Sequence, residues 1–144
     1  MTTMTIEIPS KPKILVVDDE RLIRTLATRF LESRYNVRTA ENPAEALTMY
    51  ISERPNKVLT DINMPGMTGL NLAEIIHAED PTAMIYVMCG AFHGDQEKQL
   101  NYLMGKGIVK GYIGKPFELQ NLYETLDGKV DTAPFPVPVP PQSL

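Results

Sequence analysis

Three short runs of this sequence each end in charged side chains. They are Ile14–Val17 before Asp18 and Asp19, Val58–Thr60 before Asp61, and Gly111–Gly114 before Lys115. Runs of this kind are typical of buried strands, and open α/β sheets bind ligands at the carboxyl ends of their strands. Carboxylates and one lysine at such an edge predict a site for a divalent metal and a phosphoryl group.

Each of these charged groups also has a more ordinary interpretation. Asp18 and Asp19 could simply cap a helix, and Lys115 could be an exposed residue before a helix that begins at Pro116. The three segments together favour the site, because Mg²⁺ prefers hard oxygen ligands and crowded carboxylates repel one another without a cation. Asp61, followed by a turn rich in proline and glycine, could then act as a nucleophile and form an acyl phosphate.

Composition limits the function classes. A chain of 144 residues with 43% hydrophobic and 22% charged residues predicts one globular domain. The net charge of -4 argues against direct DNA binding as the main role. Residues 1–12 do not resemble a signal peptide, and no apolar run approaches the roughly 20 residues that span a bilayer. The single cysteine excludes an internal disulfide, so we expect a cytoplasmic protein without membrane association.

The hydrophobic pattern alternates between strand-like and helix-like segments. Strands are predicted at 13–17, 36–40, 57–60, 83–88 and within 108–113, and helices at 20–33, 43–53, 69–78, 94–104 and 117–126. This alternation predicts an α/β fold with a doubly wound parallel sheet of five strands. In the first helix we expect Asp19 to act as the cap and Leu22, Leu26 and Phe30 to form the buried stripe.

Both ends of the chain differ in composition from the middle. Residues 1–12 predict a flexible leader, and 13–128 the folded domain. Residues 129–144 predict a disordered tail, because five prolines lie between Asp131 and Leu144 and favour extended polyproline II. A docking peptide or the start of a linker is the alternative for this tail.

Three segments resemble the signature segments of bacterial response-regulator receiver domains. They are Ile14–Glu20, Thr60–Gly69 and Lys115–Phe117, and the resemblance extends over residues 13–126. It implies a flavodoxin-like receiver fold with the strand order 2-1-3-4-5. It also implies a two-component phosphorelay, in which a sensor histidine kinase or a phosphotransfer protein donates a phosphoryl group.

The same resemblance implies a role for each matching residue. Asp61 would accept the phosphoryl group, and Lys115 would contact it. Asp18, Asp19 and Asp61 would hold Mg²⁺ together with the backbone carbonyl of Asn63. The peptide bond between Lys115 and Pro116 is expected to be cis.

The sequence departs from the family at the end of the fourth strand. Cys89 stands where relatives carry a Thr or Ser hydroxyl that moves to the phosphoryl group, and a thiol is a weaker donor. Two interpretations remain open: Cys89 weakens the coupling of phosphorylation to the rest of the fold, or it only fills space. Tyr112 matches the aromatic residue of the family's switch. The interval of 26 residues from Cys89 to Lys115 indicates an unusual fourth helix or flanking loop.

The leading hypothesis is a single-domain response regulator, a non-enzymatic switch whose phosphorylation changes its binding to an unknown downstream protein. A homodimer is left open. The first alternative is a Mg²⁺-dependent phosphohydrolase with Asp61 as nucleophile. It is disfavoured because Asn63 stands where the dehalogenase-like phosphatases carry a general acid. The second alternative is a degenerate receiver that binds partners without phosphorylation, which Cys89 alone supports.

Overall fold

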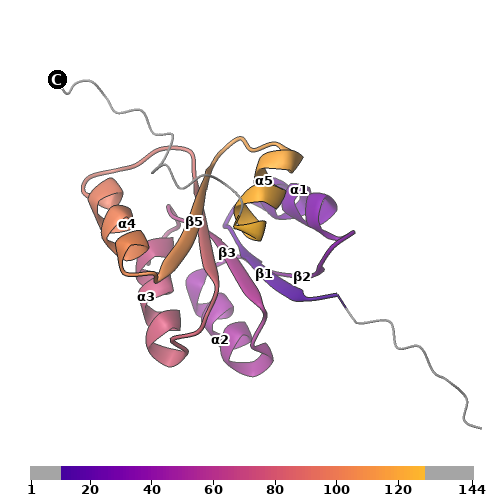
Figure 1. Cartoon of the computed structure of the whole chain (residues 1–144), viewed down its shortest axis with the longest axis horizontal. Helices are drawn as coiled ribbons and strands as arrows, with labels where there is room; N and C mark the ends of the chain where they lie inside the picture. The colour runs from indigo at the N-terminus through magenta and orange to yellow at the C-terminus, as the bar shows by residue number, and fades with distance from the viewer. Residues whose placement is uncertain (1–10, 129–144) are drawn as a thin grey trace, which may run out of the picture.

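The computed structural model describes residues 11–128 as a parallel sheet of five strands in the order β2-β1-β3-β4-β5 (Figure 1). The strands are β1 Lys13–Val17, β2 Asn36–Ala40, β3 Lys57–Asp61, β4 Ile85–Cys89 and β5 Val109–Gly114, and the helices are α1 Arg21–Leu31, α2 Pro43–Glu53, α3 Gly69–Glu79, α4 Gln96–Gly105 and α5 Leu119–Asp127. The predicted fold class and strand order are confirmed.

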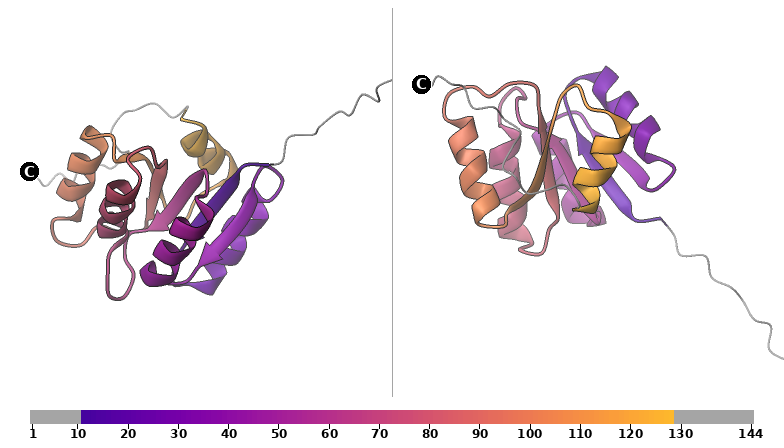
Figure 2. Two further views of the ribbon diagram at one scale, coloured as in Figure 1. Left: turned by 90° about the horizontal axis from the view of Figure 1, so that it is seen from below. Right: turned by 45° about the horizontal axis from the view of Figure 1, so that its top comes forward.

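Helices cover both faces of the sheet and create two hydrophobic cores (Figure 2). Alternate residues of each strand point to opposite faces, so Leu15 and Val17 join the core beneath α2, α3 and α4, while Ile14 and Val16 join the core beneath α1 and α5. Strands buried on both sides explain why β1 and β4 read as continuous apolar runs.

The register of the strands brings the chemical groups to one edge. Val17 pairs with Thr60, Asp61 with Met88, and Cys89 with Gly114. The residues that follow or end these strands therefore share the carboxyl edge of the sheet, where parallel α/β folds bind ligands. The sheet thus gathers residues that are up to 97 positions apart in sequence, such as Asp18 and Lys115.

Two expectations about α1 are wrong. Its N-cap is Glu20, without a side-chain cap, and the backbone N–H of Glu20 instead donates to Asp18 Oδ1 at 2.8 Å. Leu22 is 75% exposed rather than buried, because Ala27 and Leu31 form the deeply buried contact of this helix. The position of Asp18 inside the sheet edge, and not helix capping by Asp19, decides how the chain enters α1.

The segment between β4 and β5 differs from the prediction in detail. Helix α4 begins at Gln96, two residues after the predicted start, and residues 90–95 form a loop before it. The expected leader and tail fall on residues 1–10 and 129–144, outside the described residues except for Lys11 and Pro12. Among residues 11–128, no helix is both long and apolar enough to cross a bilayer.

Candidate functional site

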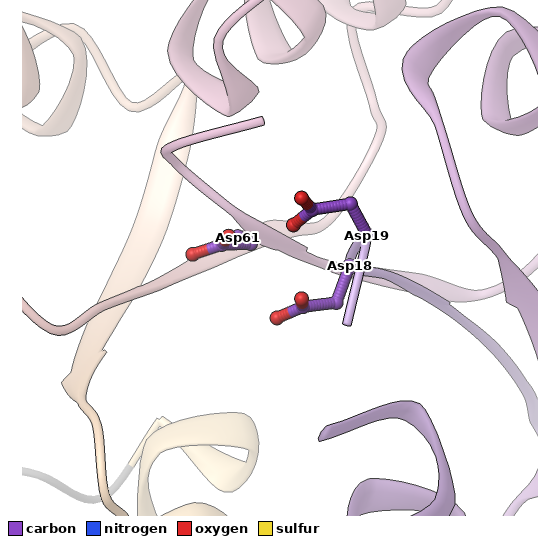
Figure 3. A group of neighbouring side chains, drawn as sticks. All are labelled: Asp18, Asp19 and Asp61. Carbon is purple, nitrogen blue, oxygen red and sulfur yellow. The ribbon is translucent and has the colours of Figure 1, made fainter. Parts of the chain in front are cut away.

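Three carboxylates meet at the carboxyl edge of the sheet. Each of Asp18, Asp19 and Asp61 offers an oxygen within 4.8 Å of the other two (Figure 3). Asp18 and Asp61 are buried, whereas Asp19 is exposed. Two charged carboxylates with little water and one at the surface form a cluster that only a positive charge can balance.

Lys115 supplies part of that charge from the end of β5. Its Nζ lies 3.0 Å from Asp18 Oδ2 and 3.2 Å from Asp61 Oδ1, so one ammonium bridges both buried carboxylates. Glu20 Oε1 lies 3.7 Å from the same nitrogen. The peptide bond from Lys115 to Pro116 is cis, and the Lys115 N–H donates to the carbonyl oxygen of Cys89 at 3.0 Å.

The lysine does not fully balance the carboxylates. Burial raises the pKa of Asp61 to about 6, with a further contribution from the Asp18 carboxylate and against the opposing effect of Lys115. Burial also raises the pKa of Asp18, against the hydrogen bonds from Glu20 and Lys115. These carboxylates raise the pKa of Lys115 in turn, which keeps its ammonium charged. The site therefore retains an attraction for added positive charge.

Gly69 fixes the turn that follows Asp61. The Gly69 N–H donates to the Ile62 carbonyl at 2.8 Å, and Thr68 caps α3 through Asn71 N–H. A Cβ on Gly69 would collide with the carbonyl oxygen of Asp61 and lie 3.1 Å from the Ile62 Cα. Only glycine allows α3 to begin this close to the backbone of the nucleophile candidate.

Cys89 lies at the end of β4, but its thiol is already engaged. It is buried, and Sγ donates to the carbonyl oxygen of Ala91 at 2.6 Å. Burial raises its pKa, so the thiol is a weak nucleophile here. Asn63 Nδ2 donates to the same Ala91 oxygen at 2.9 Å and lies 3.8 Å from Cys89 Sγ.

Tyr112 is half-buried on β5 next to the β4–α4 loop. Its ring stacks on Phe92 with a centroid distance of 5.7 Å and an angle of 25°. Burial raises the pKa of its hydroxyl, with a smaller contribution from Cys89. The two residues predicted as a switch are thus neighbours, and Phe92 adds a ring to them that the sequence analysis did not single out.

The structure brings together all of the predicted site residues at one edge, with Tyr112 at its periphery. The sequence analysis missed four contributors: Glu20 beside Lys115, Gly69 behind Asp61, Gln96, which contacts Asn63, and Phe92, which stacks on Tyr112. Glycine at the end of the turn was a usable signal for Gly69. The sequence carried no signal for Gln96, because nothing in the local pattern relates it to Asn63, 33 positions earlier.

The donor set fits Mg²⁺. Carboxylate oxygens are the hard ligands it prefers, and the exposed side of Asp19 leaves room for the waters that Mg²⁺ usually keeps. Burial and then the Asp18 carboxylate raise the pKa of Asp61, so a cation bound at the cluster would favour its ionised form. No His or Cys belongs to the cluster, which argues against zinc.

Comparisons with known proteins agree with this architecture. The family described as response regulator receiver domain matches residues 14–127. The chain is 36% identical over 117 residues to the chemotaxis protein CheY of Listeria monocytogenes, an alignment covering 80% of this chain and 95% of that protein. CheY of Halobacterium salinarum is 33% identical, with 79% and 92% covered.

Solved structures give the same result. A CheY-like receiver domain protein from Methanospirillum hungatei superposes with a TM-score of 0.74 at 29% identity, covering 83% of this chain and 94% of that one. The response regulator TrrA from Thermotoga maritima, solved in complex with Mg²⁺ and BeF, gives a TM-score of 0.71 at 32% identity, with 83% and 99% covered.

Proposed function

This chain belongs to the response regulator receiver family of two-component signalling, and we propose that it is a regulator that accepts a phosphoryl group on Asp61. The observation that carries the proposal is the meeting of three carboxylates within 4.8 Å with Lys115 bridging two of them. The alignment with 95% of the Listeria chemotaxis protein supports a role in two-component signalling of this kind.

The transfer follows from the positions of these groups. A carboxylate oxygen of Asp61 attacks the phosphorus of a phosphohistidine; the O–P bond forms, the N–P bond breaks, and the imidazole nitrogen keeps the electron pair. Lys115 Nζ, 3.2 Å from Asp61 Oδ1, is within reach of a phosphoryl oxygen bound there. Mg²⁺ held by Asp18, Asp19, Asp61 and the Asn63 carbonyl would offset the negative charge that donor and acceptor share.

The donor and the receiving partner are proposed in general terms. A sensor histidine kinase or a phosphotransfer protein supplies the phosphoryl group, and phosphorylation changes binding to a separate downstream protein in the cytoplasm, with Cys89 and Tyr112 at the switch. Asn63 has both ends of its amide engaged, with Ala91 and Gln96. It offers no general acid, so we expect slow self-dephosphorylation and not the turnover of a phosphohydrolase.

Intact mass after incubation with acetyl phosphate and Mg²⁺ tests the proposal. We expect one added phosphoryl group, lost in Asp61→Asn and in metal-free buffer. Asp80→Asn is the matched control, because it removes a carboxylate at the opposite edge of the sheet and should leave the addition intact. No addition to the folded protein, or an addition that survives in Asp61→Asn, would contradict the proposal.

A further inference from the structure

The side chain of Asn63 connects two loops at the site. It follows Asp61 by two residues, and its amide reaches the β4–α4 loop, formed by residues 90–95. Asn63 Nδ2 donates to Ala91 O at 2.9 Å, and Asn63 Oδ1 accepts from Gln96 Nε2 at 2.8 Å. Both ends of one amide are therefore bonded to the segment that leads into α4.

Gln96 extends this connection into the helix. It is the first residue of α4, and its Oε1 accepts from the His93 N–H at 2.8 Å while its own N–H donates to His93 O at 3.2 Å. The side chain thus holds the turn before the helix with one end and Asn63 with the other. The Gln96 side chain therefore connects Asn63 directly to the first turn of α4.

Cys89 contacts the other end of the same amide. The thiol donates to Ala91 O at 2.6 Å, the oxygen that also accepts from Asn63 Nδ2, and Cys89 Sγ lies 3.8 Å from that Nδ2. The Cys89 side chain therefore contacts Asn63 and the β4–α4 loop, whereas the contact with Gln96 is made by Asn63 Oδ1. The hydrogen bond between Asn63 and Gln96 joins the loop between β3 and α3, residues 62–68, to the first residue of α4.

We propose that Gln96 is a positioning residue that transmits occupancy of the carboxylate site to α4 through Asn63. The inference rests on the proposed function and adds a route: the Asn63 carbonyl is a proposed metal ligand, and Gln96 holds the amide of the same residue.

The same helix supplies a matched control. Gln99 Nε2 donates to Asn71 Oδ1 at 3.0 Å, which is again a glutamine of α4 bonded to an asparagine. Asn71 lies in α3 and does not belong to the turn after Asp61. Loss of this pair removes a hydrogen bond between the same two residue types, away from the turn that follows Asp61.

Three variants separate the connection from ordinary helix stability. Gln96→Ala removes both contacts of the side chain while raising helix propensity. Gln96→Glu keeps an acceptor for the His93 N–H but has no donor for Asn63 Oδ1. Gln99→Ala is the control. The readout is amide hydrogen exchange by NMR at Gln99, whose N–H donates to Asp95 O at 2.9 Å, and at Leu100.

We expect both Gln96 variants to exchange these amides about tenfold faster than wild type without ligand, the size of one net hydrogen bond. Gln99→Ala should stay within about threefold, because its hydrogen bond to Asn71 is exposed, whereas the bond from Gln96 to Asn63 is partly buried and the same side chain also holds His93. Mg²⁺ with beryllofluoride should slow exchange in wild type and Gln99→Ala, but not in Gln96→Glu that binds the same probe. A Gln96→Glu protein that responds like wild type would overturn the proposal.

Failure of the proposed function gives a different result. If wild type binds no Mg²⁺ and beryllofluoride by calorimetry, the phosphoacceptor proposal fails. The exchange rates without ligand still decide whether Gln96 holds α4 to Asn63: rates in Gln96→Ala equal to those in Gln99→Ala would exclude the connection.

Discussion

Two carboxylates, Asp61 and Asp80, lie at opposite ends of the strands, and their pKa values are shifted in opposite directions. We call the end where the strands begin the amino edge and the end where they stop the carboxyl edge. At the carboxyl edge, burial and a neighbouring carboxylate raise the pKa of Asp61 to about 6. At the amino edge, Asp80 follows α3 and accepts hydrogen bonds from Tyr50 Oη at 2.7 Å and from Thr82 Oγ1 at 2.7 Å and Thr82 N at 3.0 Å. These donors, with Arg54 nearby, lower the pKa of Asp80 to about 2.

The difference lies in burial and in the number of donors for each carboxylate. Asp80 has its own donors and needs nothing from solution. Asp18 and Asp61 share one ammonium, so their ionised forms cost folding energy until a cation arrives. Unbalanced charge at one edge and full satisfaction at the other is the pattern expected when the first edge binds a ligand and the second only stabilises the fold.

Substitution of Gly69 should have the largest effect on the carboxyl edge of the sheet. In Gly69→Ala the new Cβ collides with the Asp61 carbonyl, so we expect a loss of about 3–5 kcal/mol in the free energy of unfolding and loss of phosphorylation. Gly105→Ala at the end of α4 is the control, because nothing lies near its Cβ and it should be neutral or stabilising. Urea unfolding measures both, and equal stability of the two variants would contradict the packing argument.

Magnesium should act on one edge only. At a Mg²⁺ concentration of 100 times its dissociation constant, we expect about 2.7 kcal/mol of added stability, because the ion binds only the folded carboxylate cluster. Asp18→Asn should lose most of this gain and Asp80→Asn should keep it. Thermal unfolding with and without Mg²⁺ makes the comparison, and a gain that persists in Asp18→Asn would mean the ion binds elsewhere.

Much of the ligand-binding edge could be predicted from sequence because strand ends are local features. An apolar run that stops at Asp61 or Asp18 fixes where each side chain lies, and parallel strands bring their ends together. Gln96 and Phe92 could not be predicted in this way. Their roles depend on how residues 90–95 fold over Asn63 and Tyr112, which no periodicity encodes.

The amino edge shows the same limit. Tyr50 and Arg54 lie at the end of α2 and Asp80 at the end of α3, and these two ends meet through tertiary packing and not through sequence proximity. Helical spacing predicts Leu22 in the buried stripe of α1, yet its side chain is 75% exposed. Spacing predicts which residues share a helix face, but the neighbouring element decides how much of that face is covered.

Neutralising Asp61 should stabilise the metal-free protein. A carboxyl whose folded pKa is raised from 3.8 to about 6 costs nothing below pH 3.8, and its cost is complete above pH 6. The shift sets an upper limit of about 3 kcal/mol, and we expect Asp61→Asn to gain about 1–2 kcal/mol at pH 8 because the contact with Lys115 is weakened. Urea unfolding in EDTA should show the gain disappearing by pH 4; a gain independent of pH would exclude this cause.

The smallest effect is expected at the amino edge, with the opposite dependence on pH. Tyr50→Phe removes the hydroxyl that donates to Asp80, and we expect a loss of about 1 kcal/mol at pH 7. Because the pKa of Asp80 is lowered from 3.8 to about 2, its stabilising effect is complete above pH 3.8 and is lost as the pH falls through 2. The cost of Tyr50→Phe should therefore be constant between pH 8 and 5, whereas the effect of Asp61→Asn already begins to fall below pH 6.

A double-mutant cycle with Asp80→Asn tests whether the stability lost in Tyr50→Phe depends on the Asp80 carboxylate. If the Tyr50 hydroxyl acts through the Asp80 carboxylate, Tyr50→Phe should cost less in the Asp80→Asn background than in wild type, measured by urea unfolding at pH 7 without Mg²⁺. Equal costs would mean that the hydroxyl stabilises α2 independently. In that case Thr82 and Arg54 would lower the pKa of Asp80 without help from Tyr50. Fewer donors would then distinguish Asp80 from the carboxylates at the site.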